Sequence, residues 1–199
     1  MEKPALTQVA IHELLARRWS GRAFDPQRPV GREQLIALLE AARWAPSCYG
    51  DQPWRFVIWQ RSEDEAGWQH AIACLSPGNQ SWAANAPVVL LVSADTLFRH
   101  NGQPNRHAQY DCGAAAENLC LQAVAQGMMA HQMGGFDADR VRELAGVPAR
   151  CVPMAMVALG YAAAADSLPD DLRERELAPR QRLVLGELCF AGTWGRPVA

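Results

Sequence analysis

One short stretch of the sequence, RRWSGR, has the residue types that bind a phosphate group. Arg18 and Arg22 are four residues apart, so a helix there would place both on one side. Ser20 lies between them, and Gly21 lets the backbone turn. Guanidinium groups, a hydroxyl and free backbone N–H groups are the donors that suit a phosphate monoester. The alternative is a solvated basic helix end that complements the helix dipole.

A second stretch, PRQR, places Arg180 and Arg182 at alternate positions. Alternate side chains of an extended segment point the same way, so the two guanidinium groups would share one side. All four arginines could converge on one phosphate from the two ends of the chain, although spacing alone does not show it. The alternative is a surface arm that its charges keep in solution.

Two loops could accommodate a flat, polar ligand. HQMGGF carries the adjacent Gly134 and Gly135, which let a backbone approach a ring closely and present bare N–H groups. APSCYGDQPW, residues 45–54, combines hydrogen-bonding groups, a glycine and aromatic residues in one connection. Plain turns are the alternative for both. No metal-like spacing and no nucleophile–base arrangement stands out, so an enzyme of this sequence would need a cofactor for its chemistry.

Apolar patterns predict the elements that position these stretches. Helices are expected over residues 7–18 (with Thr7 as cap), 33–45, 62–75, 112–127 and 137–145. Strands are expected over residues 54–60, 87–93 and 152–161, with a possible last strand over 183–190. The continuous apolar run 87–93 is typical of a strand covered on both faces. The mixture predicts an α/β or α+β sheet with helices on its faces, and an arm over 162–182.

Composition limits the class of protein. A net charge of −2 gives no overall attraction to nucleic acid or to an anionic membrane. The longest apolar runs are too short to span a bilayer, and the N-terminus lacks the features of a signal peptide. The six cysteines form no C-x-x-C pair and are expected to be reduced and mostly buried in a cytoplasmic protein.

The order of these stretches resembles the FMN-dependent nitroreductase family. RRWSGRAFD, AARWAPSCYGDQPWRFVI and NAPVVLLVSAD are followed by YDCGAAAENLCLQAVAQGM, GGFDADRVRELAGVP, MAMVALGY and PRQRLVLGELCFAGTWG. The R-x-S-x-R pattern followed by P-S-x(4)-Q-P-W carries most of the specificity. The resemblance implies one FMN-binding domain over residues 1–199 with an α+β fold. Its mostly antiparallel central sheet would be flanked by helices, and its C-terminal extension would wrap the partner subunit of a homodimer.

The resemblance also implies a set of residues that bind FMN at the dimer interface. The first motif would hold the flavin phosphate and ring edge, the late basic pair would grip the phosphate, and the glycine loop would lie along the isoalloxazine ring. The P-S segment would reach the flavin of the other subunit. The expected contacts are Arg18, Trp19, Ser20, Arg22, Pro46, Ser47, Cys48, Tyr49, Gly50, Asn79, Met133, Gly134, Gly135, Arg180 and Arg182.

One position departs from the family pattern. Many members have an asparagine where this chain has Gly50, so an amide that contacts the ring or the substrate is missing. The Asp51 carboxylate and the backbone N–H of Gly50 are two candidates to replace it.

The activity that the resemblance implies is NAD(P)H-dependent reduction of small flat acceptors such as nitroaromatics or quinones. Hydride would pass through FMN in ping-pong fashion, so no side chain is expected to be catalytic. Alternatives are a flavoenzyme of the same fold that catalyses dehalogenation, flavin fragmentation or heterocycle oxidation, and a flavin-binding protein without activity. A helical interaction module with solvated arginines is a further alternative.

Overall fold

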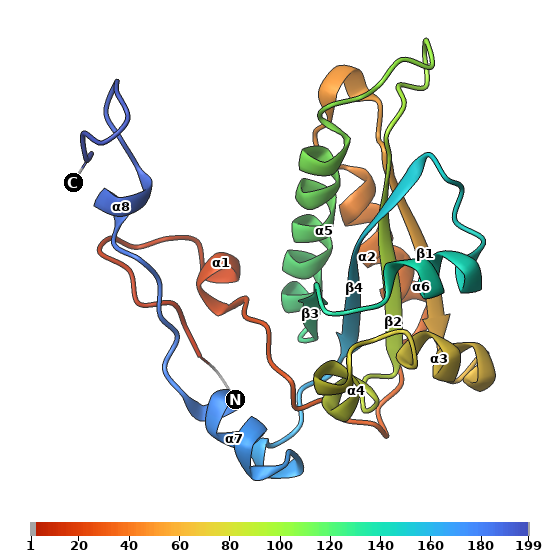
Figure 1. Cartoon of the computed structure of the whole chain (residues 1–199). Coiled ribbons are helices and arrows are strands. Elements are labelled where there is room, and N and C mark those ends of the chain that lie inside the picture. Colours follow the sequence, from red (N-terminus) through yellow and green to blue (C-terminus); the bar gives the residue numbers. More distant parts are fainter. Residues whose placement is uncertain (1–2, 199) are drawn as a thin grey trace.

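A four-stranded antiparallel sheet forms the centre of the protein (Figure 1). The computed structural model describes residues 3–198. The strands are hydrogen-bonded in the order β1 (Trp54–Gln60), β2 (Val88–Asp95), β4 (Cys151–Gly160) and β3 (Met129–Met133). Because every neighbouring pair is antiparallel, the expected α+β class with an antiparallel sheet is confirmed. Strands β1 and β3 are the two edges.

Helices cover both faces of the sheet, as Figure 1 shows. One face packs against α2 (Arg32–Arg43) and α5 (Ala108–Ala125). The other packs against α3 (Glu65–Ile72), α4 (Pro77–Ala83) and α6 (Ala138–Ala145). Each helix buries an apolar face there and leaves most of its polar residues in water. No helix within residues 3–198 is both long and apolar enough to cross a membrane.

Strand β2 explains why two cores form. Val88, Leu90 and Val92 point into the core beneath α2 and α5, whereas Val89 and Leu91 point into the opposite core. Alternate side chains of a strand face opposite sides, so a run without polar residues must be covered twice. The prediction of a strand buried on both faces is therefore confirmed.

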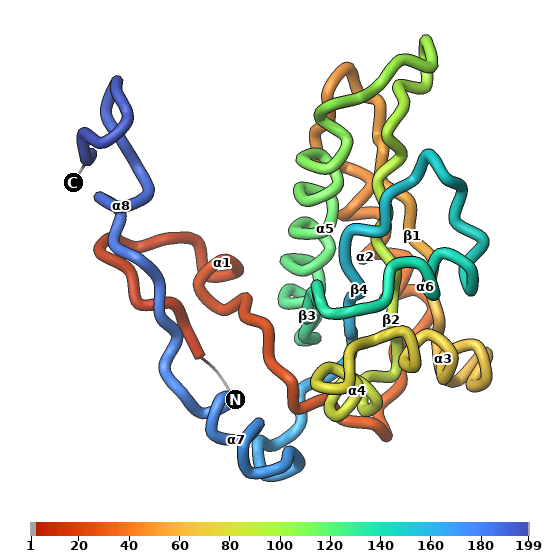
Figure 2. The backbone as a smooth tube through the Cα atoms, viewed as in Figure 1, coloured from red at the N-terminus to blue at the C-terminus, as the bar shows by residue number. Residues whose placement is uncertain are grey.

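Both chain ends leave this body and run side by side, as Figures 1 and 2 show. We call residues 3–17 and 178–198 the paired arms. The guanidinium of Arg180 donates to the carbonyl oxygens of Lys3 at 2.7 Å and Ala16 at 2.8 Å, which ties one arm to the other. The arms also contain α1 (Glu13–Arg17) and α8 (Leu185–Leu188), and α7 (Asp170–Leu177) precedes the second arm. Their large apolar side chains are mostly exposed, among them Leu6, Val9, Leu183, Val184, Leu188 and Trp194.

Two predicted elements in the arms are wrong. The helix expected over 7–18 begins only at Glu13, and the ring of His12, not Thr7, accepts the capping hydrogen bond from the Leu14 N–H. The strand expected over 183–190 is the short helix α8 instead. In both stretches the sequence pattern would place apolar residues on one face, but in the arms this face does not pack against the sheet. Val9, for example, is 73% exposed. Without burial, a short helix or lone strand gains little stability.

Three elements of the body and its connections were not predicted. Strand β3 is five residues of mixed character, and the short α4 lies in a stretch without periodicity. Helix α7 carries acidic and basic residues on most faces but buries Leu172 and Glu176. As predicted, the cysteines are mostly buried: all six are free, and four of them are buried, namely Cys74, Cys112, Cys120 and Cys151.

Candidate functional site

One cavity of about 220 Å³ collects both arginine-rich stretches. The segment after α1 and the segment after α7 both line this cavity, which we call the arginine cavity. Its lining residues are Lys3, Arg18, Trp19, Ser20, Arg22, Arg175, Ala178, Pro179, Arg180 and Arg182. The four arginines that the sequence could not place together therefore converge on one site. Lys3 and Arg175 join them, although no local pattern distinguished these two from other surface cations.

The segment that carries Arg18 and Arg22 is extended, not helical. Helix α1 ends at Arg17, and Arg18 already has extended backbone angles (φ −60°, ψ 124°). Gly21 is needed for close packing, because a Cβ there would overlap the Met129 sulfur and lie 2.9 Å from a Glu176 carboxylate oxygen. The arginines thus reach one cavity through an extended backbone pressed against β3.

Positive charge accumulates around the arginine cavity. Burial lowers the pKa of the Arg180 guanidinium, and the charges of Arg18 and Arg182 lower it further. Burial likewise lowers the pKa of Lys3, with Glu176 opposing the effect and Arg180 and Arg22 adding to it. Arg18 is partly neutralised by Glu117, at 3.2 Å. Like charges this close repel one another, so the cavity is suited to an anion.

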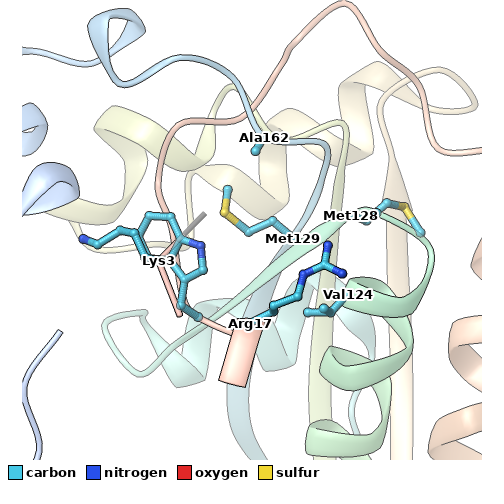
Figure 3. A pocket seen from close by; sticks show the side chains of 8 residues that line it. Lys3, Arg17, Val124, Met128, Met129 and Ala162 are labelled. Carbon is cyan, nitrogen blue, oxygen red and sulfur yellow. The ribbon is translucent and has the colours of Figure 1, made fainter. Parts of the chain in front are cut away.

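A smaller cavity of about 120 Å³ adjoins the first, since Lys3 and Trp19 line both. Figure 3 shows Lys3, Met129 and Ala162 around it. Its other lining residues are Arg17, Val124, Gly127 and Met128. The Lys3 ammonium lies 4.7 Å from the centre of a Trp19 ring, so a cation and an apolar surface meet where the cavities join.

Strand β3 connects the arginine segment to the glycine loop. His131 on β3 has its Nδ1 2.9 Å from the carbonyl oxygen of Gly21, and its ring centre lies 4.5 Å from that of Trp82. The pKa of His131 is lowered to about 4, chiefly by burial; the hydrogen bond to Gly21 opposes this, and the charges of Arg22 and Arg18 add to it. The imidazole is therefore neutral at pH 7, and its Nδ1–H donates to Gly21. The expected glycine pair follows the end of the same strand.

The glycine loop packs on the start of α4. The carbonyl oxygen of Gly135 accepts hydrogen bonds from the Ser76 N–H at 2.9 Å and from the Asn79 side-chain amide at 3.0 Å. The structure therefore brings Asn79 to the glycines, with its NH₂ group engaged there. A Cβ on Gly134 would meet nothing within 4 Å, so this residue presents open backbone. The Met133 side chain points into the core and leaves only its backbone for a ligand.

The segment Pro46–Gly50 lies at the other end of α5. The Cys48 N–H donates to Asp111 in the first turn of α5 at 3.0 Å, whereas the smaller cavity is lined by Val124 in the last turn. Thirteen helical residues separate these positions, which corresponds to roughly 20 Å. Within a single chain, the Pro46–Gly50 segment therefore lies far from the arginine cavity.

Neither candidate to replace the missing asparagine amide is free. The Gly50 N–H donates to the Ser47 carbonyl oxygen at 3.0 Å. The Asp51 carboxylate is only 5% exposed and accepts from the Arg99 N–H at 2.8 Å and from Asn105. Asp51 thus fastens this turn to the loop that follows β2. Sequence alone did not signal this role, because the partners are about 50 residues away.

An exposed aromatic group marks the same turn. Tyr49 adopts a left-handed conformation (φ 54°) that leaves the residue 85% exposed. Its ring centre lies 5.9 Å from those of Phe98 and His100, and both contacts are edge-on. Left-handed backbone is unfavourable for tyrosine, so the surrounding hydrogen bonds hold this ring outward.

The whole chain is similar to several known proteins. A solved oxidoreductase containing FMN superposes with a TM-score of 0.89 at 37% identity, covering 96% of each chain. An uncharacterized 15.4 kDa protein of Mycolicibacterium smegmatis is 39% identical over 127 residues, which cover 62% of this chain and 82% of that protein. A putative NAD(P)H nitroreductase of Bacillus subtilis, YdgI, is 27% identical over 187 residues, which cover 76% and 88%. Residues 15–161 match the Nitroreductase family, and the chain belongs to that family.

Proposed function

We propose that the protein is an FMN-dependent NAD(P)H oxidoreductase whose arginine cavity binds the flavin phosphate. The observation that carries this proposal is the convergence of Arg18, Arg22, Arg180 and Arg182 on one cavity beside Ser20. The similar oxidoreductase contains FMN, and YdgI is named as an NAD(P)H nitroreductase.

The residues around the cavity fit a phosphate monoester. Burial lowers the pKa of Arg180 and Lys3 most, and the phosphate dianion would offset the repulsion from neighbouring arginines that lowers both pKa values further. One guanidinium group can bind two phosphate oxygens at once, and a hydroxyl such as that of Ser20 adds one more donor. The open backbone at Gly134 and the apolar side of Trp19 suit the flat remainder of FMN.

Bound FMN would supply the capacity to accept hydride from a nicotinamide and to pass electrons to an acceptor. The protein itself would bind, orient and shield. Neutral His131 fixes the carbonyl of Gly21, and thereby the segment that carries Arg22. The cations of the arginine cavity would hold the phosphate end, so that the other end stays in one orientation.

A homodimer would complete the site. The Pro46–Gly50 segment is far from the arginine cavity of its own chain, so a second copy would supply it. The exposed apolar side chains of the paired arms are the surface that we expect to cover the partner. Tyr49, exposed beside Phe98, would then face a small flat acceptor such as a nitroaromatic or a quinone. In this proposal residues 1–199 act as one domain, and the reduced cysteines suit the cytoplasm.

Anaerobic titration of the FMN-loaded protein with NADH and with NADPH tests this proposal. We expect the absorption of oxidised flavin to bleach, and a nitroaromatic or quinone to restore it. A protein that takes up no FMN would contradict the cofactor assignment. A bound flavin that neither nucleotide bleaches would identify a flavin-binding protein without the proposed activity.

Replacing Gly50 with asparagine should strengthen FMN binding. Gly50 has φ +64°, which asparagine tolerates better than most residues, and a Cβ there meets nothing within 4 Å. An added amide facing the ligand should lower the FMN dissociation constant about fivefold, the effect of roughly one hydrogen bond. The control is Gly102→Asn, at φ +70° and with equal space. Isothermal titration that finds the two variants equal would show that position 50 does not face the flavin.

A further inference from the structure

The buried carboxylate of Glu176 lies near the arginine cavity, and the proposed function gives it no role. Glu176 lies in α7 and is only 3% exposed. Both carboxylate oxygens lie 3.0 Å from the Arg22 backbone nitrogen, and one lies 3.2 Å from that of Ala23. A carboxylate removed from water is costly unless donors surround it. Here the donors are backbone N–H groups from a segment more than 150 residues away.

These hydrogen bonds fix the backbone at the position where Arg22 enters the cavity. Glu176 holds the N–H groups of Arg22 and Ala23, while His131 holds the carbonyl of Gly21. The backbone of this segment is therefore held through two of its N–H groups and through one carbonyl group. Glu176 itself does not line the cavity, although its charge raises the pKa of Lys3, which does.

Helix α7 also positions the other side of the cavity. The Lys3 ammonium donates to the carbonyl oxygens of Glu176 at 2.6 Å and of Ala178 at 2.5 Å, which fastens the first arm to the end of this helix. Arg175 on α7 and Arg180 just beyond it both line the cavity. Glu176 thus connects the two arginine-bearing segments: it lies on α7, beside Arg175 and Arg180, and its side chain binds the backbone of Arg22.

We propose that Glu176 is a positioning residue for phosphate recognition. Its carboxylate holds the Arg22–Ala23 backbone so that the Arg22 guanidinium meets a phosphate together with those of Arg180 and Arg182. This inference rests on the proposed function, because the phosphate is that of FMN. Since Glu176 acts only on the phosphate end, its loss should weaken FMN binding and leave the binding of riboflavin, which lacks the phosphate, unchanged.

Titration of the full-length, flavin-free protein with FMN and with riboflavin, followed by flavin fluorescence, tests this role. Glu176→Ala should raise the FMN dissociation constant about tenfold, as expected when a hydrogen bond to a charged group is lost. The riboflavin constant should stay the same. Glu176→Gln should be intermediate, because it keeps one acceptor oxygen but turns an NH₂ group toward a backbone N–H. Glu174→Ala, an exposed residue of the same helix, should match the wild type.

The outcomes separate this inference from the proposed function. If the wild type prefers FMN to riboflavin and Glu176→Ala keeps the full preference, the positioning role is wrong. Equal weakening of both ligands would also overturn it, since that points to a general loss of structure. If the wild type itself shows no preference for FMN, the arginine cavity is not a phosphate site, and the proposed function fails first. Should Glu176→Ala not fold by circular dichroism, Glu176→Gln decides by the same comparison.

Discussion

Replacing Arg22 and Arg182 together with alanine is expected to raise the FMN dissociation constant by roughly 100-fold or more. Both side chains line the arginine cavity, and in residues 3–198 neither forms the kind of carboxylate pair that holds Arg18 to Glu117. Their loss should therefore remove phosphate contacts without leaving a carboxylate unpaired. The measurement is the flavin content of the purified variant, followed by titration with FMN.

The matched control for this variant is Arg32→Ala with Arg106→Ala. These two arginines are exposed and do not line the arginine cavity, so the same change in net charge is made elsewhere. The control should retain wild-type FMN content. Full FMN content in the cavity variant would show that the phosphate binds elsewhere.

Acid should destabilise the protein through His131. Burial lowers the pKa of this histidine from 6.5 to about 4 in the folded protein. The unfolded chain therefore binds a proton at this side chain below pH 6.5, while the folded protein stays neutral until about pH 4. Stability is thus fully present above pH 6.5 and falls as the pH drops through this window. The free energy of unfolding should lose on the order of 3 kcal/mol from this group by about pH 4.

His131→Asn should remove this part of the pH dependence. An asparagine amide is neutral at every pH and can still donate to the carbonyl of Gly21. Urea unfolding of the flavin-free protein at pH 7.5 and at pH 4.5 measures the difference. His100→Asn, at an exposed position, should keep the wild-type slope. If His131→Asn loses as much unfolding free energy between pH 7.5 and pH 4.5 as the wild type does, the acid sensitivity comes from other groups.

The helices and strands of the body could be predicted because the residues that the sequence pattern marks as apolar are the ones that the fold buries. The apolar run of β2 faces two cores, and α6 begins after the Asp137 cap and ends at Gly146 in the left-handed conformation. These local signals agree with the tertiary environment. In the arms they do not, because the apolar faces of residues 7–12 and 183–190 have no sheet to cover. The predicted helix is therefore reduced to α1 after residue 12, and the predicted strand is replaced by the four residues of α8.

The arginines of the site could be expected from the ordered motifs, but their supporting residues could not. Glu176, Lys3 and Asp51 act through backbone groups that lie far away in the sequence. Almost every residue has a backbone N–H group, so the residue type of the partner does not reveal that a carboxylate binds it. Long-range contacts of this kind follow only from the folded chain.

A crystal structure of the protein grown with FMN tests the central claim most directly. The phosphate is expected in the arginine cavity, in contact with the guanidinium groups of Arg22, Arg180 and Arg182. The Glu176 carboxylate should remain on the backbone of Arg22, and the Pro46–Gly50 segment of a second copy should border the ring. An FMN phosphate bound outside the arginine cavity would contradict the account.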